Sequence, residues 1–492
     1  MSEREQQARR QRLAALREAG IDPYPPRVST REAIAQVRAR FGARDAESLE
    51  RENGCVAIAG RIMALRSFGK LIFLTLLEDG VSIQVSARKE RLDPELFRFV
   101  KKLDVADFIR VGGPVWRTGK GELTVDIDEA ILLAKALRPL PEKWHGLSDV
   151  EVRFRQRYLD LLSNPTSRQI AVQRSRAISA MRSFLDGRGF LEVETPVLQP
   201  LYGGAAALPF QTHHETYDQQ LYLRISDELY LKRLMVGGLE RVYEIGHNFR
   251  NEGISRKHSP EFTMMECYQA YADYRDMMEL TESLLKMMAQ AVHGSTRLEF
   301  QGREIDLEKP WPRIGLCDAL RDAIGVDVLA HDDLEGLRAA VRAAGHEPGD
   351  APTWAKLVDE LFSEHVEPGL FEPTFVIDYP VELSPLAKRS PEDPRLVERF
   401  ELFLAGMEVG NAFSELNDPD DQRARLEAQG VMRTAGDAEA HPLDEDYLTA
   451  LEHGMPPTGG LGIGVDRVVM ILTGAPSLRE VILFPHLRPE SD

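Results

Sequence analysis

The stretches Arg241-Val-Tyr-Glu-Ile-Gly-His-Asn-Phe-Arg-Asn-Glu252 and Glu261-Phe-Thr-Met-Met-Glu-Cys-Tyr268 indicate how the larger part of this chain folds. Both are typical of β-strands, and the polar residues 253–259 between them suit a loop, so the pattern predicts an antiparallel hairpin. Side chains alternate between the two faces of a strand. One face of the first strand should therefore carry Arg250 and Glu252, and one face of the second should carry Phe262, Glu266 and Tyr268.

These side chains suit a purine nucleotide that lies beside a substrate with an ammonium group. Arginine offers planar donors to phosphate, and an aromatic ring stacks on a base. The loop adds Arg256, Lys257 and His258. A solvated hairpin with salt bridges is the alternative, and polar alternation alone favours it.

A glycine-rich stretch, Gly459-Gly-Leu-Gly-Ile-Gly-Val-Asp-Arg467, runs into an apolar helix at residues 468–472. Glycines before a helix let the backbone and a ligand approach closely, and Arg467 is placed where it could meet phosphate. Neither a P-loop nor the Rossmann glycine spacing occurs in the sequence. Tight packing is the other explanation of these glycines.

A third stretch contains two carboxylates seven residues apart, Glu401 and Glu408, followed by Asn411, Phe413 and Glu415. The last three fall on one strand face. Carboxylate oxygens are ligands that magnesium accepts, usually together with phosphates. Simple exposure is the alternative in a chain this acidic.

The front of the chain predicts a small β-barrel. Residues 1–20 and 29–41 suit helices, and from Cys55 the apolar period changes to two, which indicates strands. Three strands, a helix over 93–103 and two more strands over 108–117 and 123–133, joined by a turn at Gly119-Lys-Gly121, give the order of a five-stranded OB-type barrel. Such barrels often bind nucleic acids, although a barrel without a ligand is equally compatible.

These patterns divide the chain and give an α+β fold class. We expect N-terminal helices over 1–52, the barrel over 53–137, a linker over 138–150 that contains Arg138-Pro-Leu-Pro141, and a main domain over 151–492 built on an antiparallel sheet with flanking helices.

Composition favours a soluble protein of a reducing compartment. The 492 residues carry a net charge of −18, which argues against indiscriminate nucleic-acid binding. Residues 1–150 are slightly basic, with 26 Lys and Arg against 22 Asp and Glu, so an RNA partner at that end is compatible with the charge, as is an ordinary uneven surface. No run of residues suits a membrane span or a signal peptide, and three scattered cysteines suit the cytoplasm.

Together the motifs resemble the class II aminoacyl-tRNA synthetases. Three signatures occur in that family's order: Gly189-Phe-Leu-Glu-Val-Glu-Thr-Pro196, Phe249-Arg-Asn-Glu252 with its return strand, and Gly462-Ile-Gly-Val-Asp-Arg467. Further motifs resemble the lysyl-tRNA synthetases of the bacterial type, namely Lys135-Ala-Leu-Arg-Pro-Leu-Pro141, Arg155-Gln-Arg-Tyr-Leu-Asp160, Gly203-Gly204, Glu261-Phe-Thr-Met-Met-Glu266, Gly410-Asn-Ala-Phe-Ser-Glu-Leu-Asn417 and Ile482-Leu-Phe-Pro485. The resemblance covers about residues 10–489.

The resemblance implies a two-step ligation of lysine to tRNA(Lys) that uses ATP and Mg²⁺. Positioning and charge neutralisation carry such catalysis. The residues that match the family's catalytic arginines are Arg250 and Arg467, and those that match its ATP site are Arg250, Glu252, His258, Phe262, Glu401 and Arg467. Glu401 and Glu408 match the magnesium ligands. Simple alternation places Glu408 on the opposite face from Asn411, so a bend or bulge near Gly410 is required.

The amino-acid pocket is implied in the same way. A lysine side chain ends in a compact ammonium with three donors, so its pocket must end in acceptors. The matching residues are Gly204, Glu228, Arg250, Glu252, Glu266, Tyr268, Asn411, Phe413 and Glu415. The acid pair Glu228 and Glu415 favours lysine over aspartate or asparagine, which relatives charge and which need cations or amide-reading groups there.

The barrel resembles this family's anticodon reader, with Arg66, Phe73, Gln84 and Glu129 at the matching positions. The helix over 167–188 and the segment 189–196 match the family's homodimer interface, although the same pattern suits a buried core. Two rivals remain. A paralogue that lysylates a protein would be expected to lack the barrel, and an inactive tRNA-binding regulator would not need an ATP site.

Overall fold

The computed structural model spans the chain and describes residues 3–140, 149–434 and 439–489. The chain forms two compact units, Met1–Val150 with Tyr158–Pro165, and Glu151–Arg157 with Thr166–Asp492. Most of the predicted linker, residues 141–148, lies outside the described ranges. Within those ranges, no helix combines the length and the apolar character needed to cross a bilayer.

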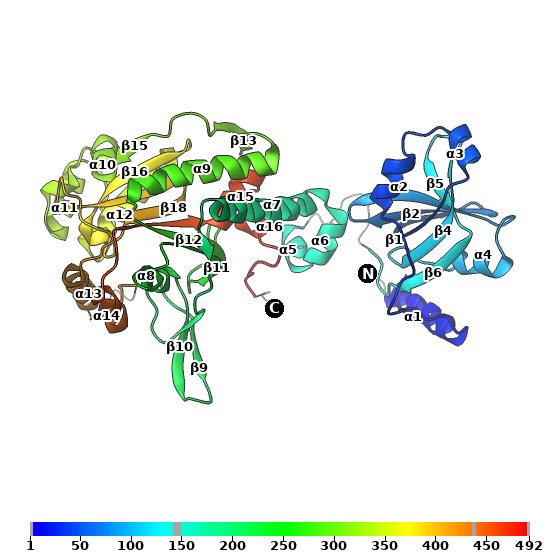
Figure 1. Ribbon diagram of the computed structural model, residues 1–492, viewed down its shortest axis with the longest axis horizontal. Helices are drawn as coiled ribbons and strands as arrows, with labels where there is room; N and C mark the ends of the chain where they lie inside the picture. Colours follow the sequence, from blue (N-terminus) through cyan, green and yellow to red (C-terminus); the bar gives the residue numbers. More distant parts are fainter. Residues whose placement is uncertain (1–2, 141–148, 435–438, 490–492) are drawn as a thin grey trace. The chain divides into compact units, whose positions relative to one another are not determined.

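The first unit contains the predicted OB-type strands (Figure 1). Their bounds are β1 Cys55–Ser67, β2 Leu71–Glu78, β3 Val81–Arg88, β4 Phe108–Arg117, β5 Leu123–Asp126 and β6 Glu129–Ala134, with helix α4 Pro94–Lys101 between β3 and β4. Pairing runs β1–β2–β3–β5–β4, and β4 pairs again with β1, so the ladder returns to its first strand. Alternate side chains of these strands fill the interior.

One prediction of detail in the barrel was wrong and one was right. Residues 123–133 do not form one strand, because β5 ends at Asp126 and β6 begins at Glu129. The break lies where the Asp126 carbonyl crosses Gly113, so closely that a Cβ on Gly113 would overlap it. The predicted turn at 119–121 is confirmed, with Gly121 in a left-handed conformation.

The N-terminal helices are α1 Glu3–Glu18, α2 Ile34–Phe41 and α3 Ala46–Glu52. The first confirms the helix predicted over residues 1–20. The helix predicted from residue 29 begins only at Ile34, because the preceding backbone is extended and the Glu32 amide donates to the Ala57 carbonyl. Ile34 and Phe41 of α2 pack into the barrel core.

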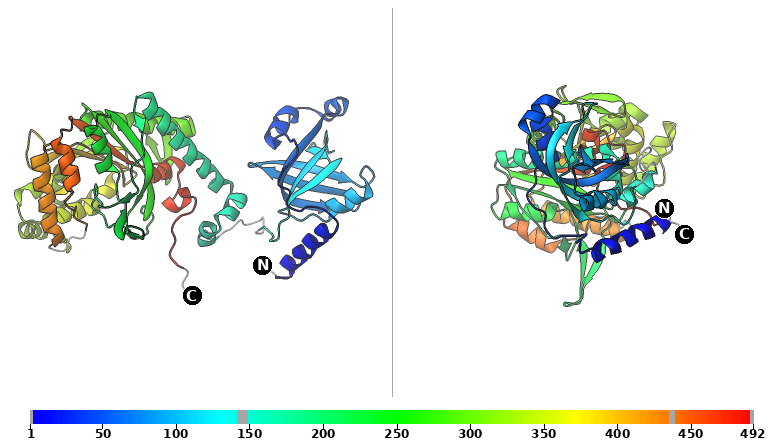
Figure 2. Two further views of the ribbon diagram at one scale, coloured as in Figure 1. Left: turned by 60° about the horizontal axis from the view of Figure 1, so that its bottom comes forward. Right: turned by 90° about the vertical axis from the view of Figure 1, so that its right-hand side faces the viewer.

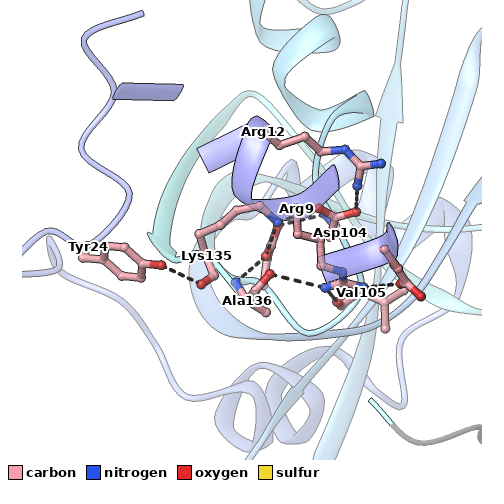
Figure 3. A network of polar contacts seen from close by, with 9 residues as sticks. Arg9, Arg12, Tyr24, Asp104, Val105, Lys135 and Ala136 are labelled. Carbon is pink, nitrogen blue, oxygen red and sulfur yellow. Dashed lines mark hydrogen bonds and ion pairs between the residues drawn. The ribbon is translucent and has the colours of Figure 1, made fainter. Parts of the chain in front are cut away.

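A buried lysine anchors the first helix to the barrel (Figure 3). The Lys135 ammonium lies 2.6 Å from an Asp104 oxygen and 2.8 Å from an Asp107 oxygen, and its side chain is 1% exposed. From α1, Arg12 pairs with the same Asp104, and Arg9 donates to the Val105 carbonyl at 2.9 Å. The helix is therefore held by charge pairing at the edge of the barrel.

The second unit is built on an eight-stranded sheet in the order β15-β16-β17-β18-β19-β12-β11-β7. Its strands are β7 Leu191–Glu192, β11 Arg241–Phe249, β12 Glu261–Ala270, β15 Arg313–Gly315, β16 Thr374–Pro380, β17 Leu396–Leu404, β18 Met407–Ser414 and β19 Thr458–Gly464. A three-stranded sheet has the order β8 Leu198–Gln199, β10 Gln219–Leu223 and β9 Gln211–His214, and its β9–β10 hairpin projects from this body (Figures 1 and 2). In addition, β13 Arg297–Phe300 pairs with β14 Arg303–Asp306.

Three helices cover one face of the large sheet: α7 Pro165–Gly187, α9 Tyr274–His293 and α15 Val465–Thr473 (Figure 1). Helix α9 begins at Asp273, whose carboxylate accepts from the Arg275 and Asp276 amides, and ends at the left-handed Gly294. The sheet side chains beneath these helices are Tyr243, Met265, Cys267, Phe400, Leu402, Val409, Ala412, Leu461 and Ile463.

The remaining elements of the second unit are α5 Val150–Arg155, α8 Glu228–Val236, α10 Leu316–Ile324, η1 Val328–Ala330, α11 Leu334–Ala343, α12 Trp354–His365, η2 Glu367–Gly369, η3 Val381–Leu383, α13 Pro419–Thr434, α14 Glu445–Glu452 and α16 Leu478–Val481. Helix α6 Arg157–Ser163 falls mainly in the segment Tyr158–Pro165, which belongs to the first unit. Helices α8 and α14 pack together around Leu231 and Tyr447. Because side chains alternate, the opposite strand positions form a second face of the sheet, and this face carries the site.

Candidate active site

A cavity of about 440 Å³ lies on the second face of the sheet, and a smaller one of about 100 Å³ adjoins it. Arg250, Met264, Glu408 and Gly462 line both. The predicted residues that line the larger cavity are Gly204, Glu228, Arg250, Glu266, Tyr268, Glu401, Glu408, Asn411, Phe413 and Glu415. Those that line the smaller one are Arg250, Glu252, His258, Phe262, Glu408 and Arg467. Folding therefore gathers every residue predicted for the catalytic domain into two connected spaces.

The hairpin predicted over residues 241–268 is present, but its first strand is shorter than predicted. Strand β11 ends at Phe249, and the Arg250 amide then donates to the Pro260 carbonyl at 2.9 Å. Arg250 and Glu252 are thus loop residues rather than strand residues, although both still face the smaller cavity. Phe262, Glu266 and Tyr268 share one face of β12 as predicted.

Arginines and an aromatic ring surround the smaller cavity. The Arg250 guanidinium lies 5.1 Å from the centre of the Phe262 ring, and burial lowers its pKa. Arg467, in the first turn of α15, donates to the Glu408 carbonyl at 2.7 Å and lies 3.1 Å from the Glu408 carboxylate. Burial and, secondly, the nearby Arg467 lower the pKa of His258. The cavity thus has two arginines and a lysine that can donate to phosphate.

A β-bulge in β18 satisfies the geometric requirement noted for Glu408. Leu402 of β17 lies opposite Gly410, whereas the next residue, Phe403, lies opposite Glu408, so Val409 is the extra residue. The bulge shifts the alternation by one position. As a result Glu408 faces the cavities together with Asn411, as predicted.

Two carboxylates occupy the junction of the cavities. Burial and then the nearby Glu408 raise the pKa of Glu401 to about 7. Each is paired with an arginine, Glu401 with Arg399 at 2.6 Å and Glu408 with Arg467. Among the described residues no cluster of three metal-ligating side chains occurs. Two carboxylates beside a phosphate-binding cavity fit a magnesium ion that is shared with nucleotide phosphates and water.

The far end of the larger cavity is acidic. Burial raises the pKa of Glu415 to about 8, and burial also raises the pKa of Glu228. Tyr268 donates to Glu266 at 3.1 Å, and Ser226 donates to the other oxygen of Glu266 at 2.9 Å.

Two glycines leave this space open. A Cβ on Gly204 would lie 2.8 Å from the Ser226 hydroxyl oxygen, and one on Gly460 would overlap a Glu415 oxygen. Any larger residue at these positions would reduce the room beside the acids.

The sequence interpretation missed the charged cavity-lining residues Lys356, Asp359, Glu382 and Arg399, and it missed Lys232, which contacts two of the lining acids. Lys232 lies between Glu228 and Glu415 and contacts both. Arg399 donates to the Asn411 side-chain oxygen at 3.0 Å. Signals for Lys232 and Arg399 were present, because Lys232 stands four residues after Glu228 on a helix and Arg399 stands two residues before Glu401 on a strand.

Three of the four predicted anticodon residues share one outer face of the barrel. Arg66 pairs with Phe73 across β1 and β2, and Gln84 of β3 lies opposite Thr75, the next residue of β2 on the Phe73 face. Opposite residues in an antiparallel ladder point to the same side. Glu129 lies on β6 outside this group, and its carboxylate accepts from Arg110 at 2.5 Å.

Comparison with known proteins fits this arrangement. The family described as "tRNA synthetases class II (D, K and N)" matches residues 149–488, and an "OB-fold nucleic acid binding domain" matches residues 56–133. The fold and site are therefore those of a class II aminoacyl-tRNA synthetase.

Curated relatives identify the family within this class of synthetases. A Lysine--tRNA ligase of Chloroflexus aurantiacus is 54% identical over 99% of each chain. That of Pelotomaculum thermopropionicum is 53% identical over 98% of this chain and 94% of its own, and that of a Roseiflexus species is 54% identical over 98% of each. The chain belongs to the lysine–tRNA ligase family of class II synthetases.

Proposed function

We propose that this protein activates L-lysine with ATP and transfers it to tRNA(Lys). The observation that carries the proposal is the pair of buried acids, Glu228 and Glu415, in a cavity that Arg250 also lines. An acidic pocket suits the side-chain ammonium of lysine, whereas aspartate and asparagine bring no cation to the acid pair.

In the first step, the lysine carboxylate attacks the α-phosphate of ATP, lysyl-adenylate forms and pyrophosphate leaves. Arg250 lines both cavities, so it is placed to hold the substrate carboxylate and the α-phosphate together. The Phe262 ring stacks on adenine with Arg467 on its other side, and His258 and Arg467 hold the terminal phosphates. Positioning and charge neutralisation supply the catalysis.

The amino-acid end is fixed by contacts from several strands. We assign Gly204 and Glu252 to the α-ammonium and Asn411 to the carboxylate, with Phe413 against the aliphatic stem. Glu228, Glu415 and Tyr268 hold the side-chain ammonium, and Glu266 supports the Tyr268 hydroxyl.

Glu401 and Glu408 are proposed to hold magnesium together with the ATP phosphates, and the ion would neutralise charge on those phosphates. We expect Glu408→Gln to raise the Mg²⁺ concentration needed for half-maximal activity more than it raises the lysine KM. An unchanged Mg²⁺ requirement would contradict this assignment.

In the second step, a terminal tRNA hydroxyl attacks the adenylate carbonyl and AMP leaves. The barrel over residues 53–137 is proposed to bind the anticodon through Arg66, Phe73 and Gln84, with a contribution from Glu129. An exposed aromatic ring, Phe68, packs edge-on against Phe73 and enlarges the stacking surface.

We further propose a homodimer in the cytoplasm. Four apolar side chains of the second unit that stand in the predicted interface and just beyond it are exposed: Val172, Leu191, Val197 and Leu198. The three cysteines of the chain are free thiols, which suits a reducing compartment. Light scattering of the purified chain tests the dimer, and a monomeric mass at micromolar concentration would refute it.

The decisive test of substrate choice is ATP–pyrophosphate exchange with each of the twenty amino acids. We expect lysine to support exchange and aspartate and asparagine to fail. Glu415→Gln should impair lysine-dependent exchange far more than ATP binding. Exchange with another amino acid instead of lysine, or an unaltered lysine KM in Glu415→Gln, would overturn the proposal.

A further inference from the structure

The two acids of the cavity already pair with a buried cation from the protein itself. Lys232 lies on α8, and its ammonium is 2.5 Å from one Glu228 oxygen and contacts one Glu415 oxygen. The side chains of Lys232 and Glu415 are 0% exposed, and that of Glu228 is 8% exposed. The same ammonium lies 5.2 Å from the centre of the Phe413 ring.

We propose that Lys232 is a specificity-determining residue of the amino-acid site, because it holds one oxygen of each acid and leaves the pair, when both acids are ionised, with a net charge of −1. The cavity end then takes one further ammonium group, that of the substrate. This inference rests on the proposed lysine activation and adds to it the residue that sets the charge of the pocket.

The geometry leaves acceptor capacity for a second cation. Lys232 contacts Glu415 through Oε2, while Oε1 is buried and, among the described residues, has no hydrogen-bond partner. Oε1 lies where a Cβ on Gly460 would stand, and Glu415, Gly460 and Tyr268 all line the cavity. An unpartnered buried carboxylate oxygen is costly, and a ligand ammonium would satisfy it.

Several titratable groups surround the acid pair. Asp227 and Glu266 interact with Glu228, and burial, followed by Asp227, raises the pKa of Glu266 well above its ordinary value. Tyr447 of α14 and His441, which lines the cavity, interact electrostatically with Lys232, and burial lowers the pKa of His441 to about 4 and raises the pKa of Tyr447. Both are therefore neutral near pH 7. Two buried carboxylates without a cation between them would repel each other, and one would take up a proton.

The alternative is that Lys232 merely occupies the place of the substrate ammonium and must move away. In that case its removal would improve lysine binding. A third possibility is that Lys232 only supports the fold, in which case its removal would be harmful in every background. If Lys232 instead sets the charge of the pocket, removing it should raise the lysine KM when both acids are present and lower it when only one acid remains.

The experiment compares four chains in ATP–pyrophosphate exchange: the unaltered protein, Lys232→Met, Glu228→Gln, and the double variant. Lys232→Met should raise the lysine KM about 30-fold or more, because without the cation one acid takes up a proton and no longer accepts from the substrate ammonium, while the ATP KM stays within about threefold. Glu228→Gln leaves one acid and Lys232, with no net charge, and should also raise the lysine KM. Adding Lys232→Met to Glu228→Gln restores −1 and should lower the lysine KM again, at least about tenfold.

Lys286→Met is the matched control, since Lys286 lies on α9 over the opposite face of the sheet. If Lys232→Met does not fold, the comparison of Glu228→Gln with the double variant decides alone. A lysine KM that is unchanged or lowered by Lys232→Met, or raised by it in both backgrounds, overturns the inference. Absence of lysine-dependent exchange in the unaltered protein would instead refute the proposed function.

Discussion

Gly460→Ala should damage the lysine pocket specifically. A Cβ at this position would overlap Glu415 Oε1 and lie 2.6 Å and 2.9 Å from two carbons of the Tyr268 ring. Gly460 does not have a left-handed backbone conformation, so alanine introduces no backbone strain of its own. The entire effect therefore comes from lost space.

The size of the increase in the lysine KM depends on whether Glu415 and Tyr268 can move away from the added Cβ. Glu415 is held through its other oxygen by Lys232, and Tyr268 is 3% exposed, so neither has room behind it. In the free protein both could shift toward the cavity, but that shift removes the space that the substrate needs. Overpacking of this kind costs about 1–3 kcal/mol, which corresponds to an increase of about 5- to 150-fold in the lysine KM.

Steady-state ATP–pyrophosphate exchange measures this effect, with lysine and ATP varied in turn. Gly464→Ala on the same strand is the control, because its Cβ would meet nothing closer than 3.8 Å. We expect Gly460→Ala to change the lysine KM and Gly464→Ala to leave it within about twofold. If both variants bind lysine equally well, Glu415 and Tyr268 do not form the end of the pocket.

Three other predictions follow from the same structure. Burial raises the pKa of Glu415 to about 8, and an ammonium binds the ionised form of this acid. The lysine KM should therefore fall by up to about tenfold per pH unit as pH rises from about 6 to about 8, and a lysine KM independent of pH would contradict this. Phe73→Ala should raise the tRNA KM about 5- to 150-fold, because one base loses a stacking contact of about 1–3 kcal/mol, and should leave pyrophosphate exchange nearly intact. Equal loss of tRNA charging and pyrophosphate exchange would argue against an anticodon role. Lys135→Met should lower the free energy of unfolding by about 3–5 kcal/mol, because it leaves Asp104 and Asp107 without their shared cation. Thermal unfolding measures this against the exposed control Lys120→Met, and equal melting temperatures of the two variants would refute the prediction.

Much of the architecture could be predicted from local patterns. The period-two runs of the barrel, the turn at Gly121 and the face shared by Phe262, Glu266 and Tyr268 depend only on neighbouring residues, and the structure has all of them. Details that depend on a distant partner were missed. The break before β6 results from the close crossing of Gly113, and the late start of α2 results from pairing with Ala57.

The bulge at Val409 lies between these two cases. The order of Glu408, Gly410 and Asn411 showed that alternation had to fail if both Glu408 and Asn411 face one site, and the register across β17 shows where it fails. The need for a bulge could be predicted from the sequence because side-chain alternation along a strand is a local rule. The position of the extra residue depends on the partner strand.

The sequence by itself determined the types of residue available for chemistry: arginines for phosphate, a ring for a base, and two acids for an ammonium. Only the tertiary structure decided the charge of the amino-acid pocket. Glu228 and Glu415 belong to distant segments that meet across the face of the sheet, and Lys232 enters between them from the next turn of α8. Burial strengthens every charge interaction at that point, and neither burial nor the identity of a partner is written in local spacing.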